Sequence, residues 1–253
     1  MPIILNTKSN PASANIADKL KRLGPDCEFI DVDARSVLEV PTDFDTDCLI
    51  VLSTHKSKEP KPMLTAHFPG NWGKAEMGGE DRKLNIAHGG MLKRLIRELE
   101  SANKKFNLNW PLFIEADHHG PLAKVPMIYV EIGSGEKEWK DELTGEVVAN
   151  AVFNATKTKP ETGSRVSTFF AVGGGHYARE FTKLVLERDD FIVAHICPKY
   201  AIDSLDEDLF KQAIEKNVDP VDKVLVLKDG TNTKQKEEVK KLSEDYGIIC
   251  EEI

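Results

Sequence analysis

Several features that would assign the chain to a specialised class of protein are missing from its sequence. The 253 residues contain no apolar run close to the roughly 20 residues needed to cross a membrane. The N-terminus has no basic segment ahead of an apolar stretch, as a secretory signal would. Low-complexity, collagen-like and coiled-coil patterns are also absent. We therefore expect a cytoplasmic, globular protein that has no membrane partner.

Cysteine is scarce, and its spacing matches no known cysteine motif. The four cysteines are scattered and include no CxxC pair: Cys27, Cys48, Cys197 and Cys250. This spacing argues against a cysteine-based zinc knuckle and against a disulfide framework. It is typical of small side chains that are buried in a protein of a reducing compartment.

Positive charge is in the minority. The chain has 34 Lys and Arg residues against 42 Asp and Glu residues, which gives a formal net charge of −8. An acidic protein is unsuited to coating nucleic acid non-specifically, so we expect no DNA partner. A local basic patch is still compatible with this charge. The candidates are Lys56, Lys58 and Lys61; Lys104 and Lys105; and Lys157, Lys159 and Arg165.

Apolar, β-rich runs alternate along the chain with amphipathic stretches of helical period. This alternation predicts an α/β fold, with a mixed, mostly parallel sheet between two layers of helices, in one domain over residues 1–253. The expected strands are 2–6, 27–32, 48–53, 111–116, 127–132, 165–172, 191–197, 223–227 and 248–251. The expected helices are 13–23, 86–105, 142–156, 178–187, 205–215 and 234–246.

Residues 54–86 interrupt this alternation. The segment is rich in proline and glycine and shows little periodicity. A loop of this length inside a compact domain is usually functional or disordered, so we expect a long functional loop here. Asn85 is the expected N-cap of the helix that follows.

The segment 115–121, Glu-Ala-Asp-His-His-Gly-Pro, carries the densest set of titratable groups. It follows an apolar strand, and ligands of open α/β sheets bind at the ends of strands. Its carboxylates and imidazoles suit metal binding or acid–base chemistry near neutral pH. In extended chain, His118 and His119 would point to opposite sides, unless a turn brings both inward.

Two further motifs combine histidine with turn residues. In the segment 173–177, Gly-Gly-Gly-His-Tyr, a strand runs through glycines into a helix, whose free N–H groups can stabilise an anion. His67 and Asn71 lie in the long loop, where Pro-Gly-Asn is also ordinary turn composition. Glu131 is an acidic residue in an apolar strand and suits either an ion pair or a site. Among the other histidines, His195 is expected to be a satisfied core residue.

Four segments, taken in this order, resemble the archaeal and plant type of D-aminoacyl-tRNA deacylase. They are 67–71 (His-Phe-Pro-Gly-Asn), 115–121, 131–134 (Glu-Ile-Gly-Ser) with Trp139 following, and 173–178 (Gly-Gly-Gly-His-Tyr-Ala). The resemblance implies a phosphorylase/hydrolase-like three-layer fold, zinc dependence, and hydrolysis of the ester that joins a D-amino acid to the 3′ end of tRNA. Two positions depart from the family pattern: Asp117 stands where Thr is usual, and Arg179 where Pro is usual.

These motifs lead to a hypothesis for the site. Zinc would acidify a water and polarise the ester carbonyl, and its ligands would come from Glu115, His118, His119 and His176. Glu131 or Asp117 would act as general base or orient a histidine. The oxyanion would be stabilised by Asn71 or by backbone N–H groups of the glycine turn. The residues assigned to the reaction besides the metal ligands are His67, Asn71, Asp117, Glu131, Gly174 and Gly175.

Two other classes of function remain open at this point. One is a zinc-dependent small-molecule amidase or a nucleoside phosphorylase on the same fold, which would keep the histidine–carboxylate site without binding tRNA. The other is a non-catalytic RNA-binding protein, which would more typically be basic. The sequence leaves open whether the protein is a monomer or a homodimer.

Overall fold

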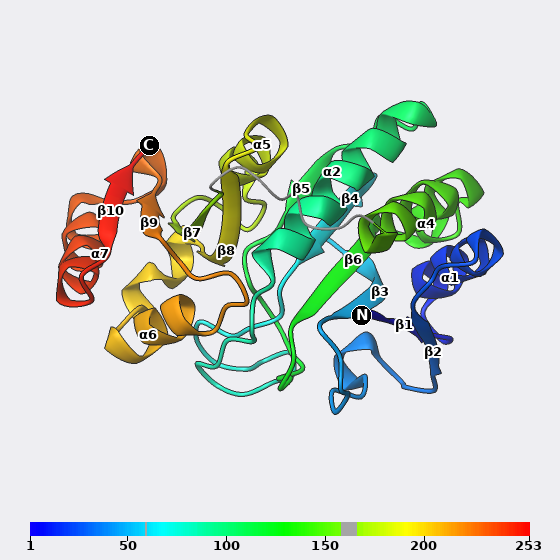
Figure 1. Ribbon diagram of the computed structural model, residues 1–253, viewed down its shortest axis with the longest axis horizontal. Helices are drawn as coiled ribbons and strands as arrows, with labels where there is room; N and C mark the ends of the chain where they lie inside the picture. The colour runs from blue at the N-terminus through cyan, green and yellow to red at the C-terminus, as the bar shows by residue number, and fades with distance from the viewer. Residues whose placement is uncertain (59, 158–165) are drawn as a thin grey trace.

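A computed structural model describes residues 1–58, 60–157 and 166–253 of the chain. Figure 1 labels its elements. The strands are β1 (Ile3–Thr7), β2 (Glu28–Val32), β3 (Leu49–Lys56), β4 (Met63–His67), β5 (Leu112–Ile114), β6 (Met127–Ser134), β7 (Ser167–Val172), β8 (Phe191–Cys197), β9 (Lys223–Val226) and β10 (Ile249–Glu252). The α-helices are α1 (Pro11–Leu23), α2 (Gly89–Lys105), α3 (Glu136–Trp139), α4 (Glu142–Lys157), α5 (Arg179–Glu187), α6 (Glu207–Glu215) and α7 (Thr233–Asp245).

The strands form two sheets. The larger has the order β2-β1-β3-β6-β4-β5, and all its neighbouring strands are parallel except β4 and β6. The smaller is entirely parallel and has the order β10-β9-β7-β8. The prediction of an α/β fold in layers with a mixed, mostly parallel sheet is confirmed, although the strands are divided between two sheets.

The two faces of the larger sheet are covered differently. The side chains of Ile4, Ile50 and Val130 pack against α1, α2 and α4, which lie side by side over one face (Figure 1). The alternate residues, such as Leu5, Val51 and Tyr129, belong to a second apolar cluster on the other face. That cluster is completed by loop residues and by the short 3-10 helix Val37–Glu39. The larger sheet thus has a helix-covered face and a loop-covered face.

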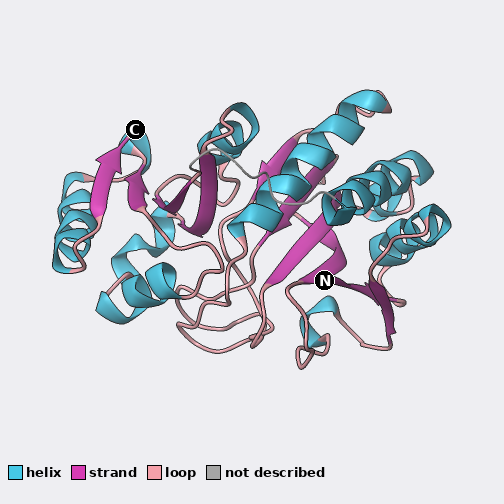
Figure 2. Ribbon diagram, viewed as in Figure 1, coloured by secondary structure: helices cyan, strands magenta, loops and turns pink. Residues whose placement is uncertain are grey.

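The smaller sheet has helices on both faces. Phe169 and Leu225 share the main core with Phe181 of α5. Phe170, whose side chain points the opposite way, shares a separate core with Phe210 of α6. The main core contains residues of both sheets, so the two sheets pack against a common interior. Figure 2 shows the loops gathered beneath the junction between them.

The structure corrects two expectations for residues 54–86. The loop is interrupted by β4, which pairs with both β5 and β6. Its short run follows Pro60 and Pro62, so the proline-rich composition hid the strand. Asn85 is not the helix cap, because His88 caps α2. Instead, the Asn85 amide donates to the carbonyls of Pro69 and Pro121 and accepts from the Ala123 N–H, so it joins its own segment to the chain at Pro69 and to the segment 121–123.

Most other element boundaries agree with the sequence to within a few residues. The expected strand over 165–172 begins at Ser167, and residue 165 lies outside the described residues. All four cysteines are free; Cys48 and Cys197 are buried, while the other two are partly exposed. Among the described residues, no helix has both the length and the apolar character that crossing a membrane requires.

Candidate functional site

The loop-covered face of the larger sheet carries the first half of the site. In the sheet register Glu131 lies between Ser53 of β3 and Thr65 of β4. Side chains two residues apart on a strand share a face. His55 and His67, each two residues beyond these neighbours, therefore lie on the same face as Glu131. The alternation of side chains along the strands thus brings together His55 of β3, His67 of β4 and Glu131 of β6.

A short bridge between the two sheets supplies the second half. The chain leaving β5 pairs with the turn before α5, through an isolated bridge between Glu115 and Tyr177. The Ala116 N–H donates to the His176 carbonyl at 2.9 Å, and the Ala178 N–H donates to the Ile114 carbonyl at 2.9 Å. This pairing brings His176 of the glycine turn against Glu115, whose nearest carboxylate oxygen is 3.0 Å from His176 Nε2.

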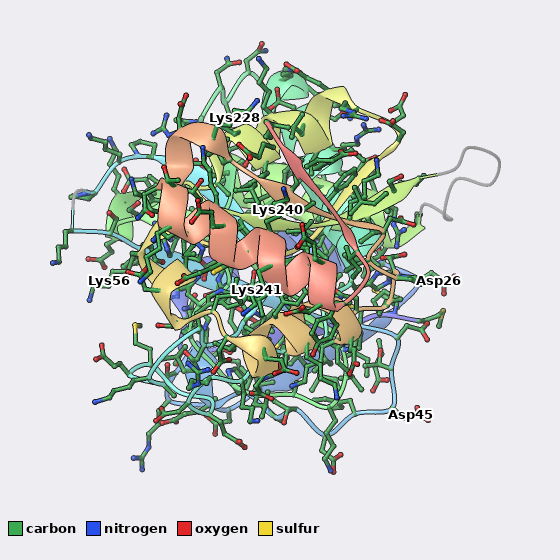
Figure 3. The ribbon with its side chains drawn as sticks, turned by 90° about the vertical axis from the view of Figure 1, so that its left-hand side faces the viewer. Asp26, Asp45, Lys56, Lys228, Lys240 and Lys241 are labelled. Carbon is green, nitrogen blue, oxygen red and sulfur yellow. The ribbon has the colours of Figure 1, made fainter. Side chains whose placement is uncertain are left out.

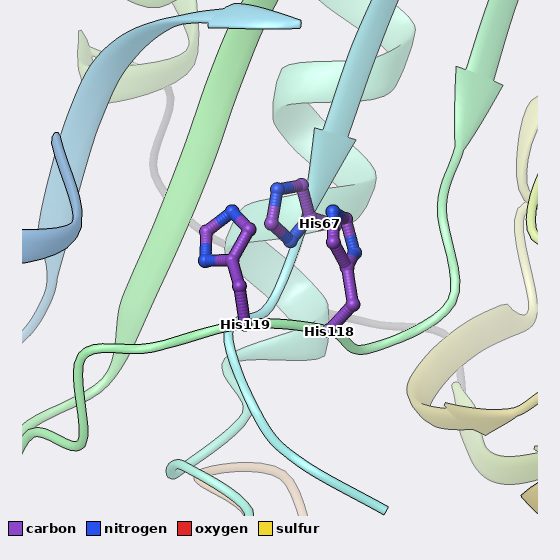
Figure 4. Close-up of side chains that lie close together, drawn as sticks. All are labelled: His67, His118 and His119. Carbon is purple, nitrogen blue, oxygen red and sulfur yellow. The ribbon is translucent and has the colours of Figure 1, made fainter. Parts of the chain in front are cut away.

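Three histidines from two segments meet at one point (Figure 4). His67 ends β4, and its ring centroid is 4.0 Å from that of His118 and 4.8 Å from that of His119. His119 has a positive φ of 49°, so the chain turns and both adjacent histidines face inward. Ligand atoms of all three lie within 4.8 Å of one another. Of the two arrangements left open by the sequence, the structure has the inward turn.

The hydrogen bonds of these histidines determine which nitrogen faces the centre. Nδ1 of His67, His118 and His119 contacts the backbone carbonyl of Phe68, Ala116 and Gly120, at 3.1, 2.8 and 2.6 Å respectively. A carbonyl can only accept, so each Nδ1 carries the hydrogen and each Nε2 keeps its lone pair. Nε2 of His67 is buried and has no hydrogen-bond partner among the described residues. Histidines that bind metals are commonly oriented in this way, with one ring nitrogen bonded to a carbonyl and the other free for the metal.

The carboxylate half of the site lies beside the histidines. His55 Nδ1 is 3.3 Å from Glu115 and 3.6 Å from Glu131, and its Nε2 contacts the Tyr177 hydroxyl at 2.9 Å. Neither Glu115 oxygen has a contact of hydrogen-bond geometry among the described residues, although both are buried. Glu115 with His118 and His176, and Glu115 with His55 and Glu131, are two further groups that could hold a metal ion.

The two halves differ in their protonation. Burial lowers the pKa of His118 and of His119 to about 4. Burial, together with these two neighbours, lowers the pKa of His67 well below its usual value. Burial also opposes a charge on His55, but its contacts with Glu115 and Glu131 outweigh burial and raise its pKa to about 11. At neutral pH three neutral imidazoles therefore lie next to an ionised His55.

Burial alone would raise the pKa of Glu115, but its contacts with His176 and His55 outweigh burial and lower that pKa well below its usual value. Glu115 is therefore ionised at neutral pH. A negative carboxylate beside neutral imidazole nitrogens is a donor set suited to a divalent cation.

Two cavities give access to this centre. One, of about 340 Å³, is lined by His118, His119, Asn71, Trp72 and Tyr200, among others. The other, of about 430 Å³, is lined by the turn 174–177 and by Arg179 and Lys199, among others. The His176 side chain is 34% exposed, so the centre is reached from the surface.

Asn71 and Asp117 have structural contacts that occupy their side chains. The Asn71 amide donates to the carbonyls of Gly78 and Glu80, at 2.9 and 3.2 Å, so neither amide hydrogen is free for an oxyanion. The buried Asp117 carboxylate bonds to His195 Nδ1 and accepts from the Ile196 N–H. These bonds attach the histidine-bearing loop to β8. The buried His195 also reaches a backbone carbonyl, which confirms it as a satisfied core histidine.

Two of the lysines in the expected basic patches have side-chain partners of their own. Lys104 pairs with Glu100 at 2.6 Å, and Lys157 lies 3.8 Å from the Phe153 ring centroid. Lys159 and Arg165 lie outside the described residues. Figure 3 shows Lys228, Lys240 and Lys241 on the end of the molecule that carries α7, with Lys56 to one side and Asp26 and Asp45 to the other. Cations are thus spread over the described surface.

The sequence left His55 equally open to a structural and a functional role, and it gave no signal for Tyr200. His55 lies near the end of β3, two residues beyond Ser53, and Ser53 is the register partner of Glu131 in β6. Tyr200 belongs to no motif in the sequence, and only the fold brings its hydroxyl to 3.3 Å from His176 Nδ1.

Comparison with known proteins gives consistent matches. The family model described as D-aminoacyl-tRNA deacylase matches residues 42–251. A D-aminoacyl-tRNA deacylase of Ignicoccus hospitalis is 33% identical, over 94% of this chain and 94% of its own length. One of Thermococcus onnurineus is 36% identical, over 80% of this chain and 72% of its own length. A crystal structure of a conserved protein of unknown function covers 100% of this chain, with 95% of its own chain matched, 24% identity and a TM-score of 0.88, which shows the same fold.

Proposed function

Because this chain belongs to the D-aminoacyl-tRNA deacylase family, we propose that it hydrolyses the ester bond of D-aminoacyl-tRNA. The products are the free D-amino acid and tRNA. The observation that supports a hydrolytic site best is the meeting of His67, His118 and His119, each with Nδ1 on a backbone carbonyl and Nε2 left as a free lone pair, beside Glu115, whose buried carboxylate groups with His118. Aminoacyl-tRNA is a cytoplasmic molecule, so we propose the cytoplasm as the place of action.

The donor set fits zinc. Zinc is commonly held by the neutral nitrogens of histidines whose other nitrogen is bonded to a carbonyl, and His67, His118 and His119 have this arrangement. We assign them as ligands, with His67 taking the place that the sequence hypothesis gave to Glu115 and His176. When bound, zinc supplies positive charge that polarises a carbonyl and acidifies water.

Glu115 and His176 are then available to move protons. Glu115 accepts a proton from the attacking water while the oxygen of that water bonds to the ester carbonyl carbon. His176 Nε2, 3.0 Å from Glu115, delivers a proton to the ribose oxygen when the carbon–oxygen bond of the ester breaks. Glu131 and the Tyr177 hydroxyl hold His55 in place, and His55 helps to keep Glu115 ionised.

The surrounding loops complete the proposed machinery. The backbone N–H groups of Gly174 and Gly175 remain the proposed oxyanion donors, since both residues line a cavity together with His176. Asn71 and Asp117 act as positioning residues. The first holds the loop beside His119, and the second attaches that loop to β8.

The decisive experiment measures release of tyrosine from D-Tyr-tRNA and from L-Tyr-tRNA in parallel, before and after treatment with a chelator and after zinc is added back. We expect release from the D-ester alone, lost with the chelator and restored by zinc. His118→Ala should reduce the rate more than about 100-fold, while His88→Asn, which keeps a side chain able to cap α2, should leave it unchanged.

Each contrary result has a separate meaning. Release of D-tyrosine that persists in the presence of the chelator would support the deacylase activity and would reject the role of zinc. No release from the D-ester by a folded, zinc-loaded protein rejects the proposed function and favours a small-molecule hydrolase on the same fold.

A further inference from the structure

Tyr200 has an unusual position for an aromatic side chain. It is 66% exposed and is the only exposed Phe, Trp or Tyr among the described residues. It lies in the 3-10 helix Lys199–Ser204, directly after β8. Its hydroxyl is 3.3 Å from His176 Nδ1, so its polar end faces the catalytic centre while much of the residue stays in solvent.

A second exposed apolar side chain lines the same cavity. Met77 is 57% exposed and comes from the long loop, far from Tyr200 in sequence. Its backbone is fixed, because the Gly120 N–H donates to the Met77 carbonyl at 3.0 Å. A Cβ at Gly120 would lie 2.1 Å from the Gly79 nitrogen, so glycine permits this close approach of the two loops. Met77 is therefore held at the edge of the cavity.

The cavity between these side chains leads to the site. Its volume is about 340 Å³, its other walls include Trp72 and Gly70, and His118 and His119 also line it. The other large apolar side chains that are exposed in the described part of the chain line neither of the two cavities that reach the site: Met1, Leu143, Val218, Ile249 and Ile253. Two exposed apolar side chains from distant parts of the sequence thus meet at the cavity that leads to the histidines.

We propose that Tyr200 and Met77 form a clamp for the unpaired base of the 3′-terminal nucleotide of tRNA. This inference rests on the proposed function. Unstacked bases of single-stranded RNA ends are held by stacking on aromatic side chains, which a thioether side chain can complete on the second face. The ester lies on the ribose of this nucleotide, so a base next to His118 and His119 brings the ester to the histidines.

The base fits this cavity better than the amino acid does. The names of the relatives specify no particular amino acid, whereas the terminal nucleotide is common to all aminoacyl-tRNAs. A stacking surface serves the constant part of the substrate. Lys199, which precedes Tyr200 in the same 3-10 helix, lines the second cavity beside the glycine turn.

The test is a thermodynamic cycle that does not depend on catalysis. Binding of uncharged tRNA, and of the same tRNA without its 3′-terminal nucleotide, is measured for the wild type and for Tyr200→Ala. On intact tRNA, we expect Tyr200→Ala to weaken binding about tenfold. On truncated tRNA, the two proteins should bind equally. Tyr200→Phe keeps the ring and should bind intact tRNA within twofold of the wild type, which separates stacking from the contact with His176.

Two further variants sharpen the result. Met77→Ala should weaken binding of intact tRNA by a smaller factor, about threefold, because a thioether stacks less well than an aromatic ring. Ile249→Ala removes a similarly exposed side chain from β10 that lines neither cavity, and it should leave the binding of intact tRNA unchanged. Circular dichroism and thermal melting verify that each variant is folded. In deacylation, Tyr200→Ala should raise KM about tenfold, with kcat within threefold.

The outcomes separate the clamp from the proposed function. A wild type that releases no D-tyrosine removes the proposed function, whatever Tyr200 does. A wild type that is active, with Tyr200→Ala unchanged on intact tRNA or equally weakened on truncated tRNA, overturns the clamp. A defect that appears only with charged tRNA, and varies with the amino acid, assigns the cavity to the amino acid and also overturns the clamp.

Discussion

The histidines of the site fall into two groups that share burial but not charge. His67 and His119 are as inaccessible as His55, yet the first two are neutral at pH 7 and His55 is ionised. His55 Nδ1 lies 3.3 and 3.6 Å from two carboxylates, whereas each of the others has its Nδ1 on a backbone carbonyl, and His67 Nε2 is 3.9 Å from Glu131. The groups in contact with a buried imidazole therefore decide whether it is charged, and burial makes an uncompensated charge more costly. The site can offer neutral ligands and an ionised acid–base pair within one cluster.

Removing a histidine from the neutral group should have the largest effect. His67→Gln takes away one Nε2 donor while it keeps a polar side chain of similar size. We expect zinc content to fall and the deacylation rate to drop more than about 100-fold. Metal analysis and single-turnover deacylation measure the two effects. Full zinc content together with the wild-type rate would contradict the assignment of His67 as a ligand.

Replacing a carboxylate that contacts the ionised His55 should lower the deacylation rate less than removing a ligand histidine does. Glu131→Gln keeps the shape of the side chain and removes one of the two carboxylates that face His55. We expect the pKa of His55 to fall from about 11 and the rate to drop about 10- to 100-fold with zinc content unchanged. NMR titration and steady-state kinetics measure these changes. Glu136→Gln, at an exposed position, is the matched control, and an equal loss in both variants would contradict a specific role.

The two groups should give opposite slopes in the pH dependence of stability. His118 and His119 have a folded-state pKa of about 4, below the ordinary 6.5, so the unfolded chain binds more protons between these values and stability rises with pH there. His55 has a folded-state pKa of about 11, so its contribution is complete below pH 6.5 and is lost as pH rises toward 11.

Urea unfolding of chelator-treated protein at a series of pH values measures these slopes. Each histidine contributes up to ~1.4 kcal/mol per pH unit within its window. Replacing both His118 and His119 by Gln should reduce the acid slope to the part that His67 contributes, and should leave the alkaline slope unchanged. An acid slope that the double replacement does not reduce would place its origin elsewhere.

The smallest effect is expected from the hydroxyl that contacts His55. Tyr177→Phe removes the 2.9 Å contact with His55 Nε2 and leaves the ring in place. We expect a loss of about 1 kcal/mol in the free energy of unfolding and a severalfold lower rate. Thermal unfolding and kinetics in parallel measure both, and a variant that is as impaired as Glu131→Gln would mean that the hydroxyl takes part in the reaction.

Much of the fold could be predicted because the elements are locally consistent. The continuous apolar run before Ser53 predicts a strand buried on both faces, and the structure has it as β3. β4 was not predicted from the sequence, because its five residues lie between prolines and a loop. The division of the strands into two sheets depends on pairing between distant segments, which periodicity does not encode.

The site was predictable to the extent that its residues belong to local motifs. The segments around His67, Glu115 and His176 were each visible as titratable groups beside strand ends or glycines. Which of them would meet was not, because it depends on the antiparallel register of β4 and β6 and on the turn at His119. The engagement of Asn71 and Asp117 with backbone was also not predictable, since the Asn71 partners lie seven and nine residues further along its own loop and the Asp117 partner lies in β8.

The bridge between Glu115 and Tyr177 has a consequence for the newly made chain. While a ribosome is still extending the protein, the strands of the larger sheet emerge first and already carry His67, Glu115 and Glu131. His176 reaches Glu115 only when the later β7–α5 turn has been made and has docked onto the end of β5. A nascent chain therefore holds an incomplete site until the β7–α5 turn has been made and has docked onto the end of β5.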